Sequence, residues 1–90
     1  MRRPTVTGQF NKDIRRMERR GKDLVKLRLV MDDIVHGRAL PDSLRDHFLK
    51  GNWRGRRECH IEADWLLIYL FRGGDEVIFE RTGRHTDLFD

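Results

Sequence analysis

Apolar residues recur at helical spacing twice within the first 37 residues of the chain. The first stripe predicts a helix over residues 9–20 that Gly21 interrupts. The second predicts a helix that ends at Gly37, because glycine is a favourable C-terminal cap. The stripes consist of Phe10, Ile14 and Met17 in the first helix, and of Leu24, Leu27, Val30, Met31, Ile34 and Val35 in the second. The opposite, basic faces of both helices should point to solvent.

The second half of the chain carries the apolar patterns of β-strands. Residues 56–61 alternate, residues 65–71 are apolar on both faces, and residues 77–81 form a short β-rich run. Gly73 and Gly74 predict the turn between the last two strands. A strand that is apolar on both faces should lie centrally in the sheet, and the helices should cover it on at least one side.

Two further segments complete the order of elements. Residues 3–7 contain β-branched side chains and predict a short N-terminal strand, which Pro4 places at a sheet edge. Residues 38–53 contain few apolar residues and predict a loop. The resulting order is β-α-α-β-β-β with a short C-terminal tail, which predicts an α+β fold and one domain over residues 1–90.

Charge is unevenly distributed along the chain. The formal net charge is +4, and residues 1–30 hold ten Lys or Arg against three Asp or Glu. Such a basic segment suits a nucleic acid, an anionic surface or an acidic protein partner, but it also suits a solvated surface rich in arginine. Charge alone leaves these possibilities open.

The cysteine content and the hydropathy of the chain indicate the cellular compartment in which we expect the protein. The single cysteine, Cys59, excludes an internal disulfide, fits a reducing cytoplasm and is most simply a small buried hydrophobe. The N-terminal segment MRRPTVTGQF lacks the apolar stretch of a signal peptide. The longest apolar run, residues 65–71, is too short to cross a bilayer. We therefore expect a cytoplasmic protein with no membrane partner.

Four histidines are the main candidates for chemistry. His36 lies at the end of the second predicted helix, where a cation complements the helix dipole, so a structural role is favoured. His47 falls in the predicted loop, His60 near a strand end and His85 in the tail. None of these three lies inside an apolar stripe, so none is expected to be a core histidine.

Strand register suggests where the side chain of His60 points. It should point away from the face that Cys59 and Ile61 bury, and the EAD turn places Asp64 within reach of it. The alternative is a plain half-buried strand, in which Glu58 and His60 simply face water.

Other candidate residues converge on the same end of the sheet. Arg81 should share a face with Val77 and Phe79 and emerge at the rim. The short tail can bring His85 and Phe89 back over the sheet, and the predicted loop leads into the same hairpin.

Three uses of such a cluster compete. Histidines and an aspartate could bind zinc, but the chain has no His-x-x-x-His or CxxC spacing. Imidazoles titrate near neutral pH, at about 6.5, and could supply the base and the acid that cleave RNA through its own 2′-hydroxyl. The third use is nucleic-acid binding alone, with bases stacking on Trp53, Trp65 or Phe89. For Trp65, packing in the core is the favoured interpretation.

Several segments together carry a specific pattern. DHFLKGNWRGRRECHIEADWLLIY and FERTGRHTDLF, with GQFNKDIRR and KDLVKLRLVMDDI in the predicted helices, resemble the YafQ branch of the RelE/ParE toxin superfamily over nearly the whole chain. The resemblance implies a RelE-like fold, with two N-terminal helices packed on a twisted antiparallel sheet. It also implies a ribosome-dependent, metal-independent mRNA endoribonuclease without cofactors, the toxin of a type II toxin–antitoxin system. Its partners would be mRNA on the translating 70S ribosome and a cognate antitoxin whose acidic segment covers the basic surface.

The family's functional residues fall on matching positions of this chain. The resemblance implies that the catalytic residues are His47, His60, Asp64, Arg81 and His85. Phe89 is implied as an mRNA contact, and further RNA contacts are expected from Lys50, Trp53, Arg54 and Arg84. In this scheme His60 or His47 takes the 2′-hydroxyl proton, and His85 gives a proton to the leaving 5′-oxygen. Asp64 orients an imidazole, Arg81 stabilises the phosphorane, and no metal site is expected.

Two other classes of protein remain open. One is a non-catalytic, ParE-like toxin that poisons a protein target, although that branch is not expected to have this histidine set. The other is a basic helix pair that binds DNA, but the apolar stripes of both helices should be committed to the core.

Overall fold

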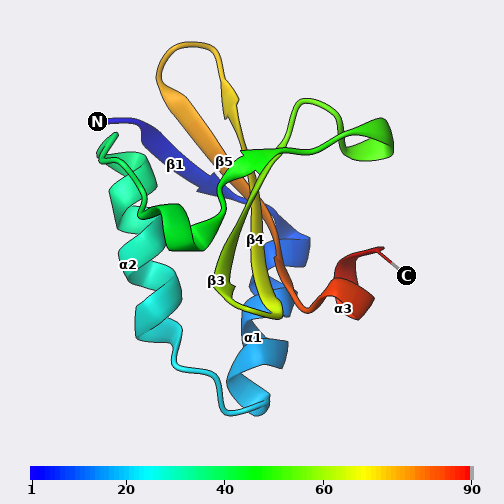
Figure 1. The fold of residues 1–90 in the computed structure, drawn as a ribbon. Coiled ribbons are helices and arrows are strands. Elements are labelled where there is room, and N and C mark those ends of the chain that lie inside the picture. The colour runs from blue at the N-terminus through cyan, green and yellow to red at the C-terminus, as the bar shows by residue number, and fades with distance from the viewer. Residues whose placement is uncertain (90) are drawn as a thin grey trace.

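In the computed structural model, which describes residues 1–89, the long elements follow the predicted order (Figure 1). They are β1 Arg3–Val6, α1 Gly8–Arg19, α2 Leu24–Val35, β3 Arg57–Glu62, β4 Trp65–Arg72 and β5 Glu76–Gly83. The short elements are the 3₁₀ helices η1 Asp42–Leu44 and η2 Gly51–Trp53, the strand β2 His47–Phe48 and the helix α3 His85–Phe89. Within residues 1–89, no helix has the length and apolar character needed to cross a membrane.

Both long helices begin at a side-chain cap. Thr7 Oγ1 accepts a hydrogen bond from Phe10 N at 2.9 Å, and Asp23 Oδ1 accepts one from Val25 N at 3.0 Å. Each cap satisfies a backbone amide that helix geometry leaves without a partner. Gly21, with a φ of 82°, lets the chain turn between the helices. The two predicted helices are therefore confirmed, with ends that differ by one or two residues.

The strands form one sheet in the order β1-β5-β4-β3-β2. The doubly apolar β4 lies at the centre and β1 at an edge, as the apolar pattern and Pro4 predicted. β1 runs parallel to β5, however, so the sheet is mixed, and the expectation of a wholly antiparallel sheet is wrong for this strand. A parallel pair needs a long connection, and the connection between these two strands includes α1 and α2.

Two segments contain more structure than their sequence predicted. The predicted loop over residues 38–53 contains η1, β2 and η2, and in β2 His47 and Phe48 pair with Glu58 and Arg57 of β3. The predicted tail forms α3. Elements this short contain too few residues to show helical or strand periodicity, so the apolar pattern could not reveal them.

Apolar side chains are buried on both faces of the sheet. On the helix face, α1 and α2 contribute Phe10, Met17, Leu27 and Ile34, which pack with Cys59, Trp65, Leu67, Tyr69, Val77 and Phe79. On the opposite face, here called the α3 face, Leu66 and Ile68 pack with Leu88 of α3. Trp65 is fully buried and donates from Nε1 to Thr82 Oγ1 at 2.9 Å, so its predicted place in the core is confirmed. The helix stripes also face the core, which counts against a DNA-reading helix pair.

A β-bulge between β4 and β5 redirects Arg81. Tyr69 pairs with Phe79, but the preceding residue of β4, Ile68, pairs with Arg81, so β5 has one extra residue between the two pairs. Because Ile68 and Tyr69 point to opposite faces, Arg81 starts from the α3 face together with Ile68. The expectation that Arg81 shares a face with Val77 and Phe79 is therefore wrong, since a bulge interrupts the two-residue period.

Candidate active site

Five rings form a continuous row, here called the ring row. The ring centroids are 6.4 Å apart for His47 and His60, 5.9 Å for His60 and His85, and 6.3 Å for His85 and Phe89. Phe89 then meets Trp53 edge to face at 5.6 Å. The rings come from β2, β3, α3 and η2, so the structure brings together three histidines that lie far apart in the sequence.

A buried carboxylate lies between two of these histidines. Glu58 Oε1 is 3.5 Å from Nε2 of both His47 and His60, and only 6% of the Glu58 side chain is exposed. The sequence analysis did not select Glu58 as a functional residue. Its separation of two residues from His60 places both side chains on one face of β3, and this spacing was the available signal. Whichever imidazole gains a proton therefore has a carboxylate beside it.

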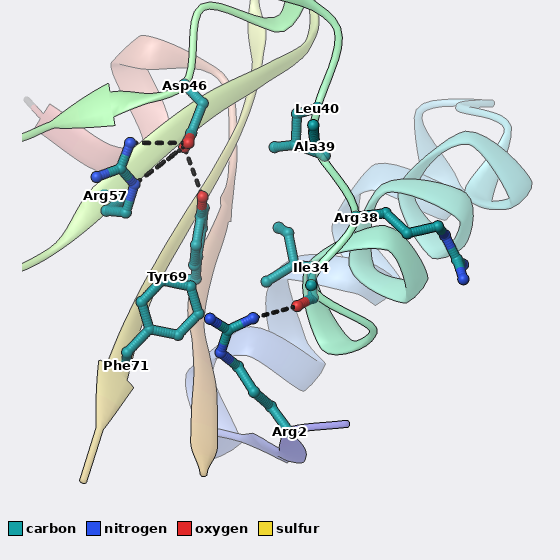
Figure 2. A pocket seen from close by; sticks show the side chains of 10 residues that line it. Arg2, Ile34, Arg38, Ala39, Leu40, Asp46, Arg57, Tyr69 and Phe71 are labelled. Carbon is teal, nitrogen blue, oxygen red and sulfur yellow. Dashed lines mark hydrogen bonds and ion pairs between the residues drawn. The ribbon is translucent and has the colours of Figure 1, made fainter. Parts of the chain in front are cut away.

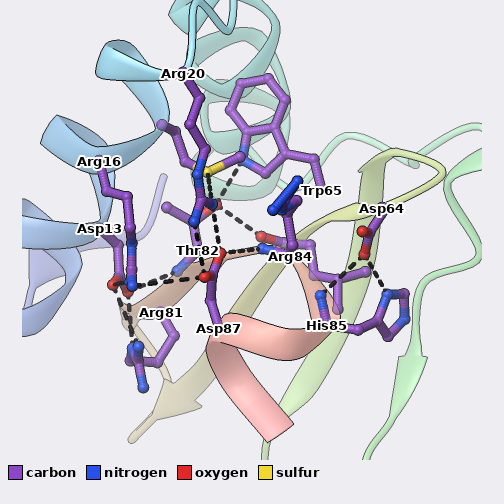
Figure 3. Close-up of polar contacts among 12 residues, drawn as sticks. Asp13, Arg16, Arg20, Asp64, Trp65, Arg81, Thr82, Arg84, His85 and Asp87 are labelled. Carbon is purple, nitrogen blue, oxygen red and sulfur yellow. Dashed lines mark hydrogen bonds and ion pairs between the residues drawn. The ribbon is translucent and has the colours of Figure 1, made fainter. Parts of the chain in front are cut away.

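Asp64 holds His85. Its Oδ1 accepts hydrogen bonds from the His85 backbone N at 2.9 Å and from His85 Nδ1 at 2.6 Å (Figure 3). These two hydrogen bonds, the backbone one first, lower the pKa of Asp64 below its usual range, so the carboxylate is ionised at neutral pH. His60 Nδ1 instead lies 3.4 Å from Ala63 O. The expected pairing of His60 with Asp64 is thus replaced by a pairing of His85 with Asp64.

Arg81 is held by a carboxylate of α1. Its Nε and Nη2 donate to Asp13 Oδ2 and Oδ1 at 2.8 and 3.3 Å (Figure 3). Asp13 is fully buried and accepts further hydrogen bonds from Thr82 N, Gln9 Nε2 and Arg16 Nη2. Burial opposes ionisation of Asp13, but the hydrogen bonds that it accepts outweigh burial and hold its pKa below the usual range. Arg81 is therefore a cation of fixed orientation near the end of β5.

Asp46 fixes the segment that carries His47. Asp46 accepts hydrogen bonds from Tyr69 Oη at 2.5 Å and from Arg57 Nη2 at 2.8 Å (Figure 2). Burial, and then the Asp46 carboxylate, raise the pKa of the Tyr69 hydroxyl, which therefore stays protonated and donates. His47 donates from Nδ1 to Arg45 O at 2.6 Å, which leaves Nε2 without a proton in the neutral ring. The hollow beside Asp46 in Figure 2 includes none of the rings of the ring row.

The predicted RNA contacts flank η2 and α3. The exposed cations among them are Lys50, Arg54 and Arg84. Phe89 is 40% exposed, whereas Trp53 is half-buried and has the Arg56 guanidinium 5.7 Å from its ring centroid. Exposed cations beside aromatic rings are typical of surfaces that bind single-stranded nucleic acids.

Comparisons with known proteins agree on one family. Residues 2–90 match the family described as the YafQ bacterial toxin of type II toxin–antitoxin systems. The chain is 41% identical over 85 residues to the mRNA interferase toxin YafQ of Escherichia coli (strain K12), covering 92% of this chain and 90% of the relative. A chain in the crystal structure of the E. coli DinJ–YafQ complex matches with a TM-score of 0.91 at 38% identity, over 100% of both chains. A copper-bound mutant toxin from Helicobacter pylori matches with a TM-score of 0.93 at 36% identity, over 99% of this chain and 100% of that chain.

These matches define the class of the protein. It is a bacterial toxin of the type II toxin–antitoxin class, with helices packed on a five-stranded mixed sheet. Within that class the chain belongs to the YafQ family, because the family match extends over nearly the whole sequence. The resemblance noted in the sequence is therefore confirmed.

Proposed function

We propose that this toxin is an endoribonuclease that cleaves mRNA on the translating ribosome by acid–base catalysis. The observation that supports this function is the close approach of His47, His60 and His85 in the ring row. Cleavage through the 2′-hydroxyl needs a base, an acid and a cation that stabilises the phosphorane, and imidazoles and an arginine suit these tasks. The name of the E. coli relative, an mRNA interferase, supports the same reaction for this chain.

The base in this mechanism is His47 or His60. The contact of His47 Nδ1 with Arg45 O leaves its Nε2 ready to take the proton of the 2′-hydroxyl, whose oxygen then attacks the phosphorus. Glu58 lies beside Nε2 of both histidines and stabilises the imidazolium that this transfer produces.

His85 is the acid. Its Nδ1 is bound to Asp64, so Nε2 remains to give a proton to the leaving 5′-oxygen. The bond between phosphorus and the 5′-oxygen breaks as the bond to the 2′-oxygen forms, and the products are a 2′,3′-cyclic phosphate and a 5′-hydroxyl. Arg81, oriented by Asp13, stabilises the negative charge of the phosphorane.

Substrate binding follows from the residues around the ring row. Phe89 and Trp53 stack on bases, and the exposed Lys50, Arg54 and Arg84 neutralise phosphates. The ribosome holds the mRNA in line with the attacking hydroxyl, which supplies the orientation that a small open surface cannot. The location is therefore the cytoplasm, and binding to ribosomes should weaken as the salt concentration rises.

The second partner is an antitoxin. The E. coli relative has been crystallised with DinJ, and this chain has a formal net charge of +4 with its cations concentrated in the first 30 residues. An acidic antitoxin segment would cover that surface and compete with its contacts to ribosomal RNA. Co-expression with the adjacent open reading frame should therefore relieve growth arrest.

The reaction does not require a metal in this scheme. A mutant of the H. pylori relative binds copper, but residues 1–89 of this chain contain no group of three or more His, Cys, Asp or Glu side chains arranged to hold an ion. EDTA should leave the cleavage rate unchanged, and loss of cleavage that Zn²⁺ or Cu²⁺ restores would contradict this part of the proposal.

The decisive experiment is cleavage of a defined mRNA in a purified translation system. The wild-type protein should leave a 2′,3′-cyclic phosphate, and His85→Ala should cleave about 10²–10⁴-fold more slowly. A fragment with a 3′-hydroxyl end, or cleavage by His85→Ala at the wild-type rate, would refute the mechanism. Growth arrest without any mRNA cleavage would favour the non-catalytic, ParE-like alternative.

A further inference from the structure

The helix α3 carries two residues of the ring row but is only five residues long. A helix of one turn is not stable in water by itself, because nucleation is unfavourable and few hydrogen bonds form. The positions of His85 and Phe89 must therefore be set by contacts between α3 and the rest of the protein.

Besides the ring contacts of the ring row, three side-chain contacts hold α3. Leu88 is buried against Leu66 and Ile68, and Asp64 binds His85. The third contact is a charge pair with α1, formed by Asp87.

The pair between Asp87 and α1 has the geometry of a clamp. Arg20 Nη1 donates to Asp87 Oδ2 at 2.6 Å and Arg20 Nη2 donates to Asp87 Oδ1 at 3.0 Å (Figure 3). Asp87 Oδ2 also accepts a hydrogen bond from Arg84 N at 2.8 Å. Only 9% of the Asp87 side chain is exposed, compared with 29% for Arg20. Two-pronged pairs of arginine with carboxylate are directional, and they are stronger than ordinary exposed ion pairs.

Gly83 makes room for this clamp. A Cβ atom at position 83 would lie 3.0 Å from Asp87 Oδ2 and 3.1 Å from Asp87 Cβ, which is too close for an unstrained side chain. A glycine here allows the Asp87 carboxylate to fold back over the start of α3. The Asp87 side chain can therefore take this position only because residue 83, just before α3, has no side chain.

Arg16 links the Arg20–Asp87 clamp to Asp13, the residue that binds Arg81. Its Nη2 donates to Asp13 at 2.6 Å and its Nη1 lies 3.6 Å from Asp87 Oδ1. Asp13 in turn holds Arg81. One face of α1 therefore contacts both α3 and the arginine of the candidate active site.

We propose that the Arg20–Asp87 clamp, linked through Arg16 to Asp13, is a positioning device through which α1 sets the places of His85, Phe89 and Arg81. This inference rests on the proposed ribonuclease function for its effect on catalysis. Arg16, Arg20 and Asp87 touch no substrate in this role. They act through α3, and Asp13 acts through Arg81.

The test compares Arg20→Gln and Asp87→Asn with Arg19→Gln. Arg19 is exposed on the same helix and, among the described residues, takes no part in the network, so its replacement removes the same charge without touching the clamp. With mRNA bound to a saturating concentration of ribosomes, the two clamp variants should cleave about ten- to hundredfold more slowly in a single turnover, because small misplacements of reacting groups cost that much. Ribosome affinity should stay the same, and Arg19→Gln should cleave at the wild-type rate.

A second measurement does not depend on any activity. The pKa of Asp64, read from its carboxyl ¹³C shift, should lie below its usual range in the wild type because His85 donates two hydrogen bonds to it. Asp87→Asn removes the clamp and keeps the Arg20 charge, which also acts on Asp64. When α3 loosens in this variant, the pKa of Asp64 should rise towards the ordinary value of about 3.9. Arg19→Gln should leave it unchanged.

The two measurements separate the possible failures. If the wild type does not cleave mRNA, the proposed function is wrong, and the Asp64 pKa alone still decides whether the clamp positions α3. If Arg20→Gln matches Arg19→Gln in rate and in the Asp64 pKa, the clamp has no positioning role.

Thermal unfolding is followed for every variant. If Arg20→Gln does not fold, Arg20→Lys, which keeps the charge without the two-pronged geometry, should show an intermediate rate, and a wild-type rate would overturn the proposal.

Discussion

The two ends of the ring row are supported in different ways. His47 is held from within the sheet: β2 pairs with β3, and Asp46 is bound by Tyr69 and Arg57 of the neighbouring strands. His85 lies on a single helical turn, and charged groups support it, namely Asp64 directly and α1 through Asp87.

This difference shows two ways to hold a catalytic side chain on a small protein. Strand pairing spreads the restraint over several backbone hydrogen bonds from the same part of the sequence. At the other end the restraint comes from single side-chain contacts, among them the charge pair between α1 and α3, which are at opposite ends of the sequence. The His85 end should therefore respond to changes of charge on α1, whereas the His47 end should respond to changes at the Arg57–Asp46 pair.

The largest expected effect tests whether both ends take part in proton transfer. His47→Ala and His85→Ala should each lower the single-turnover cleavage rate about 10²–10⁴-fold, because a positioned acid or base contributes that much. Both side chains are about half exposed, at 48% and 50%, so the temperature of unfolding should change little. A large loss at only one end would restrict proton transfer to that end.

A smaller effect is expected at Glu58, the carboxylate beside His47 and His60. Glu58→Gln should slow cleavage about tenfold to hundredfold, because the imidazolium formed on His47 or His60 loses its neighbouring negative charge. Glu62→Gln is the matched control, since it removes a carboxylate from the same strand whose partners are Lys22 and Lys26. Equal rates for the two variants would exclude a role of Glu58 in the reaction.

The support of the His47 end can be weakened without touching a histidine. Tyr69→Phe removes the hydrogen bond to Asp46 from a largely buried site and should lower the free energy of unfolding by about 1–2 kcal/mol in a urea titration. The ring signals of His47 in an NMR spectrum should shift, whereas those of His85 should not. Equal shifts at both histidines would mean that the two ends are not supported independently.

The smallest effect is the pH dependence of the clamp. The hydrogen bonds from Arg20 hold the pKa of Asp87 well below its usual range, although burial opposes this. A carboxyl group whose pKa is depressed in the folded state stabilises the protein above its unfolded pKa of about 3.9, and this contribution is lost as the pH falls through the folded value. The stability difference between wild type and Asp87→Asn should thus be constant from pH 7 to 5 and shrink in more acidic solution. A difference that does not depend on pH would show that the Asp87 charge contributes nothing.

Much of the fold could be predicted from periodicity, because burial imposes a regular pattern on helices and strands. The limits of α1 and α2, the central place of β4 and the edge place of β1 all follow from such patterns. The histidines could be selected because they lie outside every apolar stripe, and the family pattern assigned roles to them. The face of Arg81 was predicted wrongly, since one extra residue in β5 leaves the local composition unchanged while it reverses the side chain.

The sequence by itself determined which residues form the core, which family the chain resembles and which side chains are available for proton transfer. Only the tertiary structure decided how those side chains are paired: Glu58 with His47 and His60, Asp64 with His85, and α1 with Arg81 and α3. The physical reason is that burial repeats along an element and so leaves a periodic trace. A contact between charged groups joins two distant points of the chain once, and nothing in the local sequence repeats to reveal it.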